Sequence, residues 1–242
     1  MRYAIFSDIH SNLEAFEAVI LALRKESVDR YFCLGDVVGY AANPLECIQR
    51  LKTIASVTVA GNHDWASVNL FPVEYFNLAA REAIVWTTLV LKNEDKEFLS
   101  SLKPVFHNED LTLVHGSLDD PEAFKYLVDL LSIESTFSVL KNNICFVGHS
   151  HIPAIFSQDP KGNIFLSKEK EIQVFPENKF VINVGSVGQP RDGNPEAAYC
   201  IYDTKTKWIQ IKRVTYNTEL TRKKIISAGL PAFLGERLLV GR

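Results

Sequence analysis

Near its beginning the chain reads Tyr3-Ala4-Ile5-Phe6-Ser7-Asp8-Ile9-His10, a short apolar run followed by an aspartate and a histidine. Short apolar runs bounded by polar residues are typical of buried β-strands. The same arrangement, in which an apolar run leads to a polar cluster, recurs along the chain. We therefore predict six sheet strands, at residues 3–6, 31–34, 57–59, 111–114, 144–147 and 180–184.

Helical patterns lie between these strands. Asparagine or aspartate favours the cap of a helix, and proline favours its first position. Asn43-Pro44 and Asp120-Pro121 both have this form. Other segments show the apolar spacing of an amphipathic helix. We predict helices at residues 13–25, from Pro44 onward, and at residues 77–91, 94–102 and 122–131.

The second half of the chain is predicted to be mostly β-structure. Residues 154–157 and 163–166 flank a Pro-Lys-Gly turn, and residues 197–202 pair with residues 208–214. An alternating βα half joined to a β-rich half favours two sheets packed face to face with helices outside. The expected fold class is therefore α/β.

The length of 242 residues exceeds that of a usual single domain, but α/β folds often keep such a length as one unit. Hydrophobic residues make up 47% of the chain and charged residues 23%, which excludes a disordered, collagenous or low-complexity protein. No composition break divides the chain. We predict one domain over residues 1–242, with the amphipathic segment 230–242 packing on the body as a terminal helix.

The charge balance argues against broad binding to nucleic acid or to an anionic membrane. There are 26 lysines and arginines against 29 aspartates and glutamates, a formal net charge of -3. No apolar run approaches the ~20 residues that cross a bilayer, and the apolar opening is too short for a signal peptide. The four cysteines form no CxxC pair, so we expect buried reduced thiols and a cytoplasmic protein. The oligomeric state is left open.

Five of the predicted strands are followed by side chains that bind metals. In open α/β sheets, ligands bind beyond the carboxyl ends of the strands, so these side chains are expected to converge. Asp8 and His10 are two residues apart, as are His149 and His151. In an extended chain, both side chains of such a pair would project to the same side. The side chains are Asp8 and His10, Asp36, Asn62 and His63, His115, and His149 and His151.

Seven of these side chains form a candidate ligand set for metal ions. Four imidazoles are too many for magnesium or calcium alone, so manganese, iron, zinc, cobalt or nickel is expected. If Asp36 bridges two ions, the set supplies about eight of roughly twelve positions around two octahedral ions. The open positions suit a bridging hydroxide and two phosphate oxygens, as in two-metal hydrolysis. The set is Asp8, His10, Asp36, Asn62, His115, His149 and His151.

These residues resemble the ordered motifs of the calcineurin-like metallophosphoesterase superfamily, which run DxH, GD, GNH, H and GHxH. The resemblance implies a four-layer α/β/β/α sandwich of two mixed β-sheets, and two divalent transition-metal ions, with manganese favoured. It also implies that Asp36 belongs to both ions. The matching blocks are Asp8-Ile9-His10, Gly35-Asp36, Gly61-Asn62-His63-Asp64, His115 and Gly148-His149-Ser150-His151. One ion would take Asp8, His10, Asp36 and His151, and the other Asp36, Asn62, His115 and His149.

The resemblance also implies how the substrate is handled. His63 matches a residue that is not a ligand but contacts the phosphate beside Asn62 and protonates the leaving oxygen. Asp64 would set the orientation of His63. An imidazole near neutrality can donate such a proton, and a metal-bound hydroxide would be the nucleophile.

One departure from the superfamily bears on the substrate. Phosphoprotein phosphatases and symmetric dinucleoside tetraphosphatases extend the second block to GDxxDRG, whereas this chain has Gly39 and Tyr40 at the positions of the second aspartate and the arginine. The segments GDVVGY and GSVGQPR are instead similar to the small bacterial and archaeal phosphoesterase branch. The second segment supplies Arg191, a candidate phosphate or substrate contact.

The sequence therefore predicts a hydrolase of small phosphoesters, acting as a phosphodiesterase or phosphatase on nucleotide-like substrates. A phosphomonoesterase, a dinucleoside polyphosphate hydrolase, a nuclease and a silent protein-binding scaffold remain as alternatives. The absence of an added nucleic-acid module argues against the nuclease, and the complete ligand set argues against the scaffold. Loops at residues 66–76 and 167–177 are expected to form the pocket walls.

Overall fold

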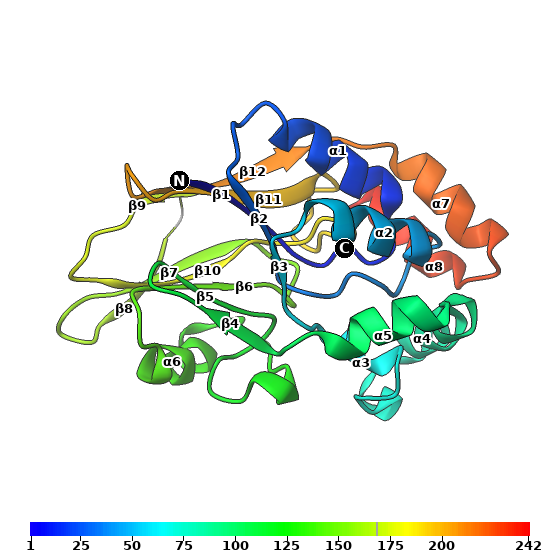
Figure 1. The fold of residues 1–242 in the computed structure, drawn as a ribbon, viewed down its shortest axis with the longest axis horizontal. Coiled ribbons are helices and arrows are strands. Elements are labelled where there is room, and N and C mark those ends of the chain that lie inside the picture. Colours follow the sequence, from blue (N-terminus) through cyan, green and yellow to red (C-terminus); the bar gives the residue numbers. More distant parts are fainter. Residues whose placement is uncertain (168) are drawn as a thin grey trace.

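Two six-stranded mixed β-sheets pack against each other in the computed structural model, which describes residues 1–167 and 169–242 (Figure 1). The strand order is β3-β2-β1-β11-β12-β9 in the first sheet and β4-β5-β6-β10-β7-β8 in the second. The first sheet contains β1 (Arg2–Phe6), β2 (Arg30–Cys33), β3 (Val57–Thr58), β9 (Glu171–Gln173), β11 (Ala197–Asp203) and β12 (Trp208–Val214). The second contains β4 (Val105–His107), β5 (Thr112–Val114), β6 (Ile144–Val147), β7 (Ala154–Gln158), β8 (Ile164–Ser167) and β10 (Lys179–Asn183).

Helices cover the outer faces of both sheets. In Figure 1, α1 and α2 lie over the first sheet and α6 lies beneath the second. The predicted four-layer α/β/β/α sandwich is therefore confirmed. The α-helices are α1 (Leu13–Leu23), α2 (Pro44–Ile54), α3 (Asn62–Ala66), α4 (Leu78–Val90), α5 (Asn93–Ser101), α6 (Leu130–Val139), α7 (Thr218–Ser227) and α8 (Ala232–Glu236), and 3-10 turns occur at Val73–Tyr75, Pro121–Ala123 and Arg237–Leu239.

Parallel pairing brings the carboxyl ends of the chemically important strands to one edge of the sandwich. Strand β1 pairs in parallel with β2, β2 with β3, and β5 with β6. The later strands mostly return antiparallel, as the two predicted hairpins require. The segments that follow β1, β2, β3, β5 and β6 can therefore meet across the two sheets.

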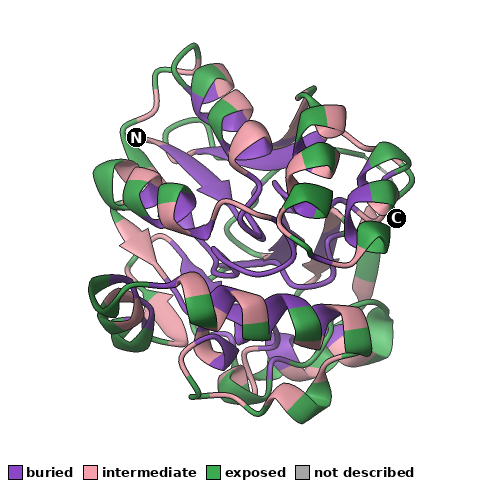
Figure 2. Ribbon diagram, turned by 90° about the vertical axis from the view of Figure 1, so that its right-hand side faces the viewer, coloured by how far each residue is buried: buried purple, intermediate pink, exposed green. Residues whose placement is uncertain are grey.

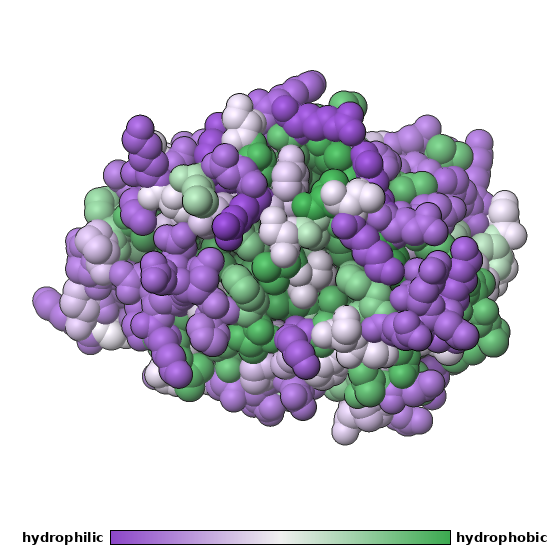
Figure 3. All heavy atoms as spheres, viewed as in Figure 1, coloured by the Kyte–Doolittle hydropathy of each residue, from purple (hydrophilic) through white to green (hydrophobic). Residues whose placement is uncertain are grey.

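The core between the sheets is built from alternate strand residues. Ile5 and Phe32 from the first sheet belong to the same buried cluster as Phe146 and Ile182 from the second. Burial of each such side chain contributes about 1.5–3 kcal/mol relative to exposure. Figure 2 shows the buried strands enclosed by helices that expose only their outer faces. Figure 3 shows hydrophilic side chains around the edge of one face and apolar ones near its centre.

The predicted helix at residues 122–131 is wrong. Asp120-Pro121 starts only a 3-10 turn, because Phe124 takes a left-handed conformation, with φ of 49°, and ends the turn. The α-helix begins instead at Leu130, where the Asp129 side chain accepts a hydrogen bond from the Ser132 backbone N–H at 2.8 Å. This capping interaction is the stronger helix start.

All four cysteines are buried and unpaired, which confirms the prediction of buried free thiols.

The C-terminal segment is split between α8 and a 3-10 turn. Its Leu230, Leu234 and Leu238 are buried in a cluster with Tyr40 and Ala83. Among the described residues, no helix combines the length and the apolar character that a membrane crossing requires.

Candidate metal centre

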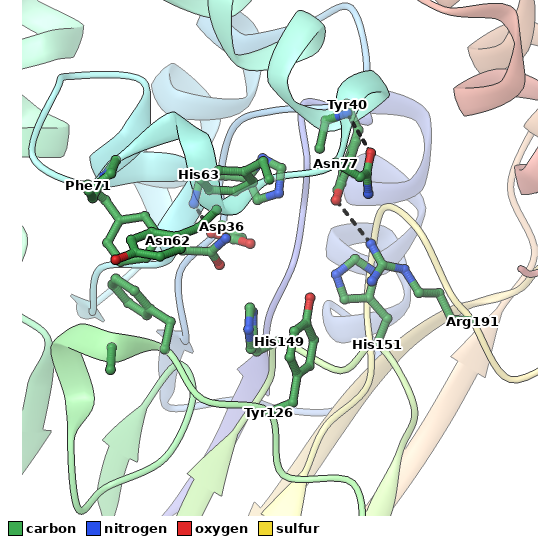
Figure 4. A pocket seen from close by; sticks show the side chains of 16 residues that line it. Asp36, Tyr40, Asn62, His63, Phe71, Asn77, Tyr126, His149, His151 and Arg191 are labelled. Atoms are coloured by element: carbon green, nitrogen blue, oxygen red, sulfur yellow. Dashed lines mark hydrogen bonds between the residues drawn. The ribbon is translucent and has the colours of Figure 1, made fainter.

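The structure brings all seven candidate ligands together at one end of the sandwich. The side chains of His149 and His151 face those of Asp36 and Asn62 across the site (Figure 4). None of the seven residues is more than 7% exposed. Asp8 and His10 follow β1, Asp36 follows β2, Asn62 begins α3 just after β3, His115 follows β5, and His149 and His151 follow β6.

Within this set, two groups of side chains have ligand atoms close enough to share an ion. In each group the ligand atoms lie within 4.8 Å of one another. A third such group, His10, Asp36 and His63, overlaps the other two. The first two groups are Asp8, His10 and His151, and Asp36, His115 and His149.

The Asp36 carboxylate belongs to the second group and also lies close to His10 of the first. Its Oδ2 atom is 3.6 Å from Nε2 of His10 and 3.3 Å from Nε2 of His115. Its other oxygen, Oδ1, accepts a hydrogen bond from the backbone N–H of His63 at 2.8 Å. One oxygen is therefore fixed by the chain, and the other faces histidines of both groups.

Backbone carbonyls fix the orientation of three of the histidine rings. A carbonyl can only accept a hydrogen bond, so each of these Nδ1 atoms carries the proton, and in the neutral ring that binds a metal each Nε2 presents a lone pair. Metal-ligating histidines characteristically have such partners. The Nδ1 atoms of His10, His115 and His151 contact the carbonyl oxygens of Val38 at 3.1 Å, Leu34 at 2.7 Å and Gln189 at 2.5 Å.

Several buried polar atoms then have no hydrogen-bond partner among the described residues. They include Oδ1 of Asp8, Oδ1 of Asn62 and Nε2 of His115. In addition, Nε2 of His10 lies 3.1 Å from Nε2 of His151, and two lone pairs at that distance repel each other unless a cation or proton lies between them. Buried polar groups are normally satisfied, so these atoms and their donor chemistry fit divalent metal ions.

The buried charges favour the ligand forms of the carboxylates. Burial alone would raise the pKa of Asp8, but His151 and His10 bring that pKa well below its usual value. Asp36 behaves similarly, because His115 and His63 outweigh the effect of burial. Burial lowers the pKa of His149 and of His151 to about 3. Burial also opposes charge on His115, yet Asp36 raises the pKa of that ring to about 9.

The backbone at the ligands is not extended, contrary to the expectation for the paired residues; Asp8 and His10 still fall in one group, whereas His149 and His151 do not. Left-handed conformations of residues other than glycine cost about 1–3 kcal/mol each and cluster at functional sites. Hydrogen bonds between the loops hold them, as from Asp8 N–H to Gly35 O at 3.0 Å. His149 and His151, although only two residues apart, consequently belong to different groups of candidate ligands. Positive φ angles occur at Asp8 (57°), His10 (49°), Asp36 (51°), His149 (66°) and His151 (62°).

The lack of a side chain at Gly148 allows the loops that carry the ligands to pack closely together. A Cβ atom at this position would lie 2.0 Å from Oγ of Ser7 and 2.6 Å from Oδ2 of Asp8. The same Oδ2 accepts the backbone N–H of His149 at 3.1 Å. A side chain at residue 148 must therefore displace a candidate ligand.

We expect Gly148→Ala to weaken metal binding without removing any ligand. Displacement of the groups that orient ligands typically costs 10–100-fold in metal affinity, so a Mn²⁺ titration by calorimetry is expected to show a loss of about that size. Gly162→Ala is the control for a glycine replacement away from the ligands: its Cβ would meet nothing within 4 Å, and its φ of 88° means that any cost falls on stability and not on metal affinity. Unchanged Mn²⁺ affinity in a folded Gly148→Ala protein would contradict the effect of crowding.

His63 lies beside the centre. Its ring centroid is 4.4 Å from that of Tyr40 and 4.8 Å from those of both His10 and Phe76. Its Nδ1 atom is buried without a hydrogen-bond partner. Burial lowers the pKa of His63 well below its usual value, while Asp36 raises it. The effect of burial on the pKa of this ring therefore outweighs that of the Asp36 carboxylate.

The hydrogen bonds of Asp64 indicate a role different from the expected one. Its carboxylate accepts backbone N–H groups of Val37 at 2.8 Å, Val38 at 3.3 Å and Gly61 at 3.0 Å. Burial and repulsion from Asp36 raise the pKa of Asp64 to about 7, and the donors at Gly61 and Val38 oppose that rise. Asp64 thus connects the loops after β2 and β3 by hydrogen bonds. Its connection to His63 is through the backbone, because the two residues are adjacent in the chain.

Arg191 reaches the site from the loop after β10. Its guanidinium donates to the Tyr40 hydroxyl at 3.2 Å and to Oε1 of Gln189 at 2.7 Å. Figure 4 shows it beside His151 on one side of the cavity. Sequence reasoning missed the contributions of Tyr40 and Gln189 to this arrangement, although both lie in the GDVVGY and GSVGQPR segments.

A cavity of about 660 Å³ opens onto the candidate ligands. The predicted wall at residues 66–76 is partly confirmed, because Phe71, Tyr75 and Phe76 line the cavity. The wall predicted at residues 167–177 is wrong for the described residues of that segment, none of which lines the cavity; Lys168 lies outside the described residues. The segment contains β9, which pairs with β12 at the edge of the first sheet.

Residues 1–207 match the sequence profile of the calcineurin-like phosphoesterase superfamily domain. The chain belongs to this superfamily. The resemblance inferred from the motifs is thus confirmed, and the chain is a metallophosphoesterase of a metal-dependent family. The seven candidate ligands all lie within the matched residues.

Similar proteins match nearly the whole chain. An uncharacterized protein of Methanocaldococcus jannaschii is 41% identical, over 99% of this chain and 98% of its own length. A crystal structure of a metallophosphoesterase from Sphaerobacter thermophilus is 36% identical, covers 100% of this chain and 99% of that one, and gives a TM-score of 0.88. A hypothetical protein from Pyrococcus horikoshii, 19% identical over 100% of this chain and 98% of that one, shares the fold at a TM-score of 0.80.

Proposed function

We propose that this metallophosphoesterase is a dinuclear metal-dependent hydrolase of small phosphoesters, with phosphodiesterase or phosphatase activity on nucleotide-like substrates. The position of Asp36 is the observation that carries the proposal. Its Oδ2 lies within 3.6 Å of His10 and 3.3 Å of His115, which belong to different candidate ligand groups. A carboxylate oxygen shared in this way is suited to a site that holds two ions close together.

The residues would divide between two ions. When bound, such ions supply Lewis acidity toward phosphate oxygens and a water nucleophile at neutral pH. Carboxylate and amide oxygens combined with imidazoles suit manganese, iron, zinc, cobalt or nickel, and we favour manganese. One ion would be held by Asp8, His10, Asp36 and His151, and the other by Asp36, Asn62, His115 and His149.

The residues around the ions would orient the substrate. In this proposal His63, with its unpartnered Nδ1, contacts the phosphate beside Asn62 and donates the proton to the leaving oxygen. Arg191 pairs with a phosphate oxygen from the opposite side of the cavity, where Tyr40 and Gln189 already hold its guanidinium. Asp64 holds the loops that carry Asp36 and His63 in register.

The cellular setting and the alternatives follow from the same features. Four buried, unpaired cysteines suit a reducing compartment, so we propose that the enzyme acts in the cytoplasm.

A cavity of about 660 Å³ suits a small phosphoester better than it suits a nucleic-acid duplex. A net charge of -3 also argues against a nuclease.

The experiment that tests the proposal compares two substrates on protein stripped of metal and reloaded. We expect Mn²⁺ to restore hydrolysis of an aryl phosphodiester more strongly than hydrolysis of the matching monoester, with Mg²⁺ alone as the control. A preference for the monoester would identify a phosphomonoesterase. No turnover of either substrate with any of the candidate metals would contradict the proposed hydrolase and favour a silent scaffold.

A further inference from the structure

We propose that an aromatic rim, formed by Phe71, Tyr75, Phe124 and Tyr126, makes the enzyme selective for phosphoesters whose ester group carries a planar aromatic ring such as a nucleobase. This inference rests on the proposed function, because it concerns what lies beside the phosphate at the metal centre. The four residues line the same cavity as the candidate ligands.

The rim is a continuous set of ring contacts that leads to the metal centre. Tyr75 contacts Phe71 with 5.6 Å between ring centroids, and Phe71 contacts Phe124 edge to face at 5.2 Å. Phe124 in turn lies 5.9 Å from the ring of His115. A planar substrate group that extends from the metal centre on this side would therefore contact these aromatic rings.

Tyr126 lies two residues beyond Phe124 in the segment before α6 and presents a ring in a stacked geometry. Its ring centroid lies 3.9 Å from that of His149, and the two planes differ by 21° (Figure 4). His149 covers one face of the tyrosine, yet Tyr126 is 51% exposed. About half of this residue therefore remains accessible to a group that enters the cavity.

Tyr75 is exposed as well. It is 78% exposed at the end of the 3-10 turn Val73–Tyr75, although it lines the cavity. Large exposed aromatic side chains around a cavity are typical of binding sites. Aromatic rings stack on any nucleobase, because every base has a π-face.

The two sides of the cavity match the two chemical parts of such a substrate. Figure 4 shows Phe71 on one side and Arg191 on the other, with Tyr126 and the candidate ligands between them. Asp36 is the one carboxylate among the described residues that line the cavity, so little negative charge opposes an anionic group. A phosphate at the centre and beside Arg191 would direct its ester group toward the aromatic rim.

The test compares the binding of AMP with that of ribose 5-phosphate, which differs by lacking the base. Calorimetry on the Mn²⁺-loaded protein measures both affinities, and released phosphate is assayed in the same samples to separate binding from turnover. Stacking on aromatic side chains contributes about 1–3 kcal/mol per base, which corresponds to about 5–150-fold. We expect AMP to bind more tightly by a factor in that range.

Variants then assign the preference to the rim. Tyr126→Ala is expected to remove most of the preference for AMP, Tyr75→Ala to reduce it, and Tyr126→Phe to retain it. Phe165→Ala is the matched control, because Phe165 is a 55% exposed ring on β8 that does not line the cavity. Inorganic phosphate should bind wild type and Tyr126→Ala equally, which separates loss of stacking from damage at His149.

The outcomes distinguish this inference from the proposed function. Equal affinity for AMP and ribose 5-phosphate, or an undiminished preference in both alanine variants, would overturn the rim even if metal-dependent hydrolysis is observed. Failure of Mn²⁺ to restore hydrolysis of aryl phosphoesters would instead overturn the proposed function, whatever the binding preference.

Discussion

Asp36→Asn is expected to show the largest loss of metal and of activity of any single substitution in this enzyme. The change removes the negative charge from the oxygen that lies within reach of both His10 and His115. It can also turn an amide N–H toward the ions. Because outer-shell changes alone cost 10–100-fold in metal affinity, loss of a shared ligand is expected to exceed about 100-fold for each ion.

Metal analysis after dialysis and kcat/KM for an aryl phosphodiester measure this prediction. Asp95→Asn is a suitable control, since Asp95 is a buried aspartate that accepts the Lys92 backbone N–H at the start of α5, away from the site. The control is expected to keep its metal content. Full activity of Asp36→Asn, or two retained ions, would refute the shared-carboxylate arrangement.

His63→Ala is expected to give the second largest effect, of a different kind. Its turnover should fall by about 10²–10⁴-fold, the contribution typical of a general acid, while the content of both metals stays nearly intact. The distinction is informative because His63 also lies in a group with His10 and Asp36 whose ligand atoms are within 4.8 Å of one another. Metal content therefore separates a proton donor from a ligand.

The leaving group provides a further readout. A proton donor matters more when the leaving oxygen is basic, so His63→Ala should lose more activity on an alkyl phosphoester than on a nitrophenyl one. His107→Ala is the control, since His107 lies at the exposed end of β4. Loss of metal, or an equal loss on both substrates, would assign His63 a structural or ligand role.

Much of the fold and of the ligand set was predictable from local sequence. Apolar runs such as residues 3–6 and 144–147 are short and bounded by polar residues, which favours buried strands, and polar side chains directly after parallel strands lie at one edge of the sheet. The position of α6 was not predictable from Asp120-Pro121. The left-handed backbone at Phe124 depends on packing of that ring against Trp65 and Phe71, which are distant in sequence.

The remaining features of the site depend on tertiary contacts. The left-handed conformations of Asp8 and His10 are held by hydrogen bonds to the loop after β2, and no spacing rule encodes them. Asp64 follows His63 in the chain, yet its partners are backbone groups of two loops. The aromatic rim is spread over loops whose rings look like ordinary loop residues until the fold places them around one cavity.

The ligand set is drawn from both sheets, with Asp8, His10 and Asp36 following strands of the first and His115, His149 and His151 following strands of the second. Ions bound there would fasten the two halves of the sandwich together. A ligand that binds only the folded chain at 100 times its Kd adds about 2.7 kcal/mol of stability. Metal shortage in a cell would then act twice, by slowing the reaction and by exposing the chain to proteases, so the abundance of this protein would follow the supply of its metal.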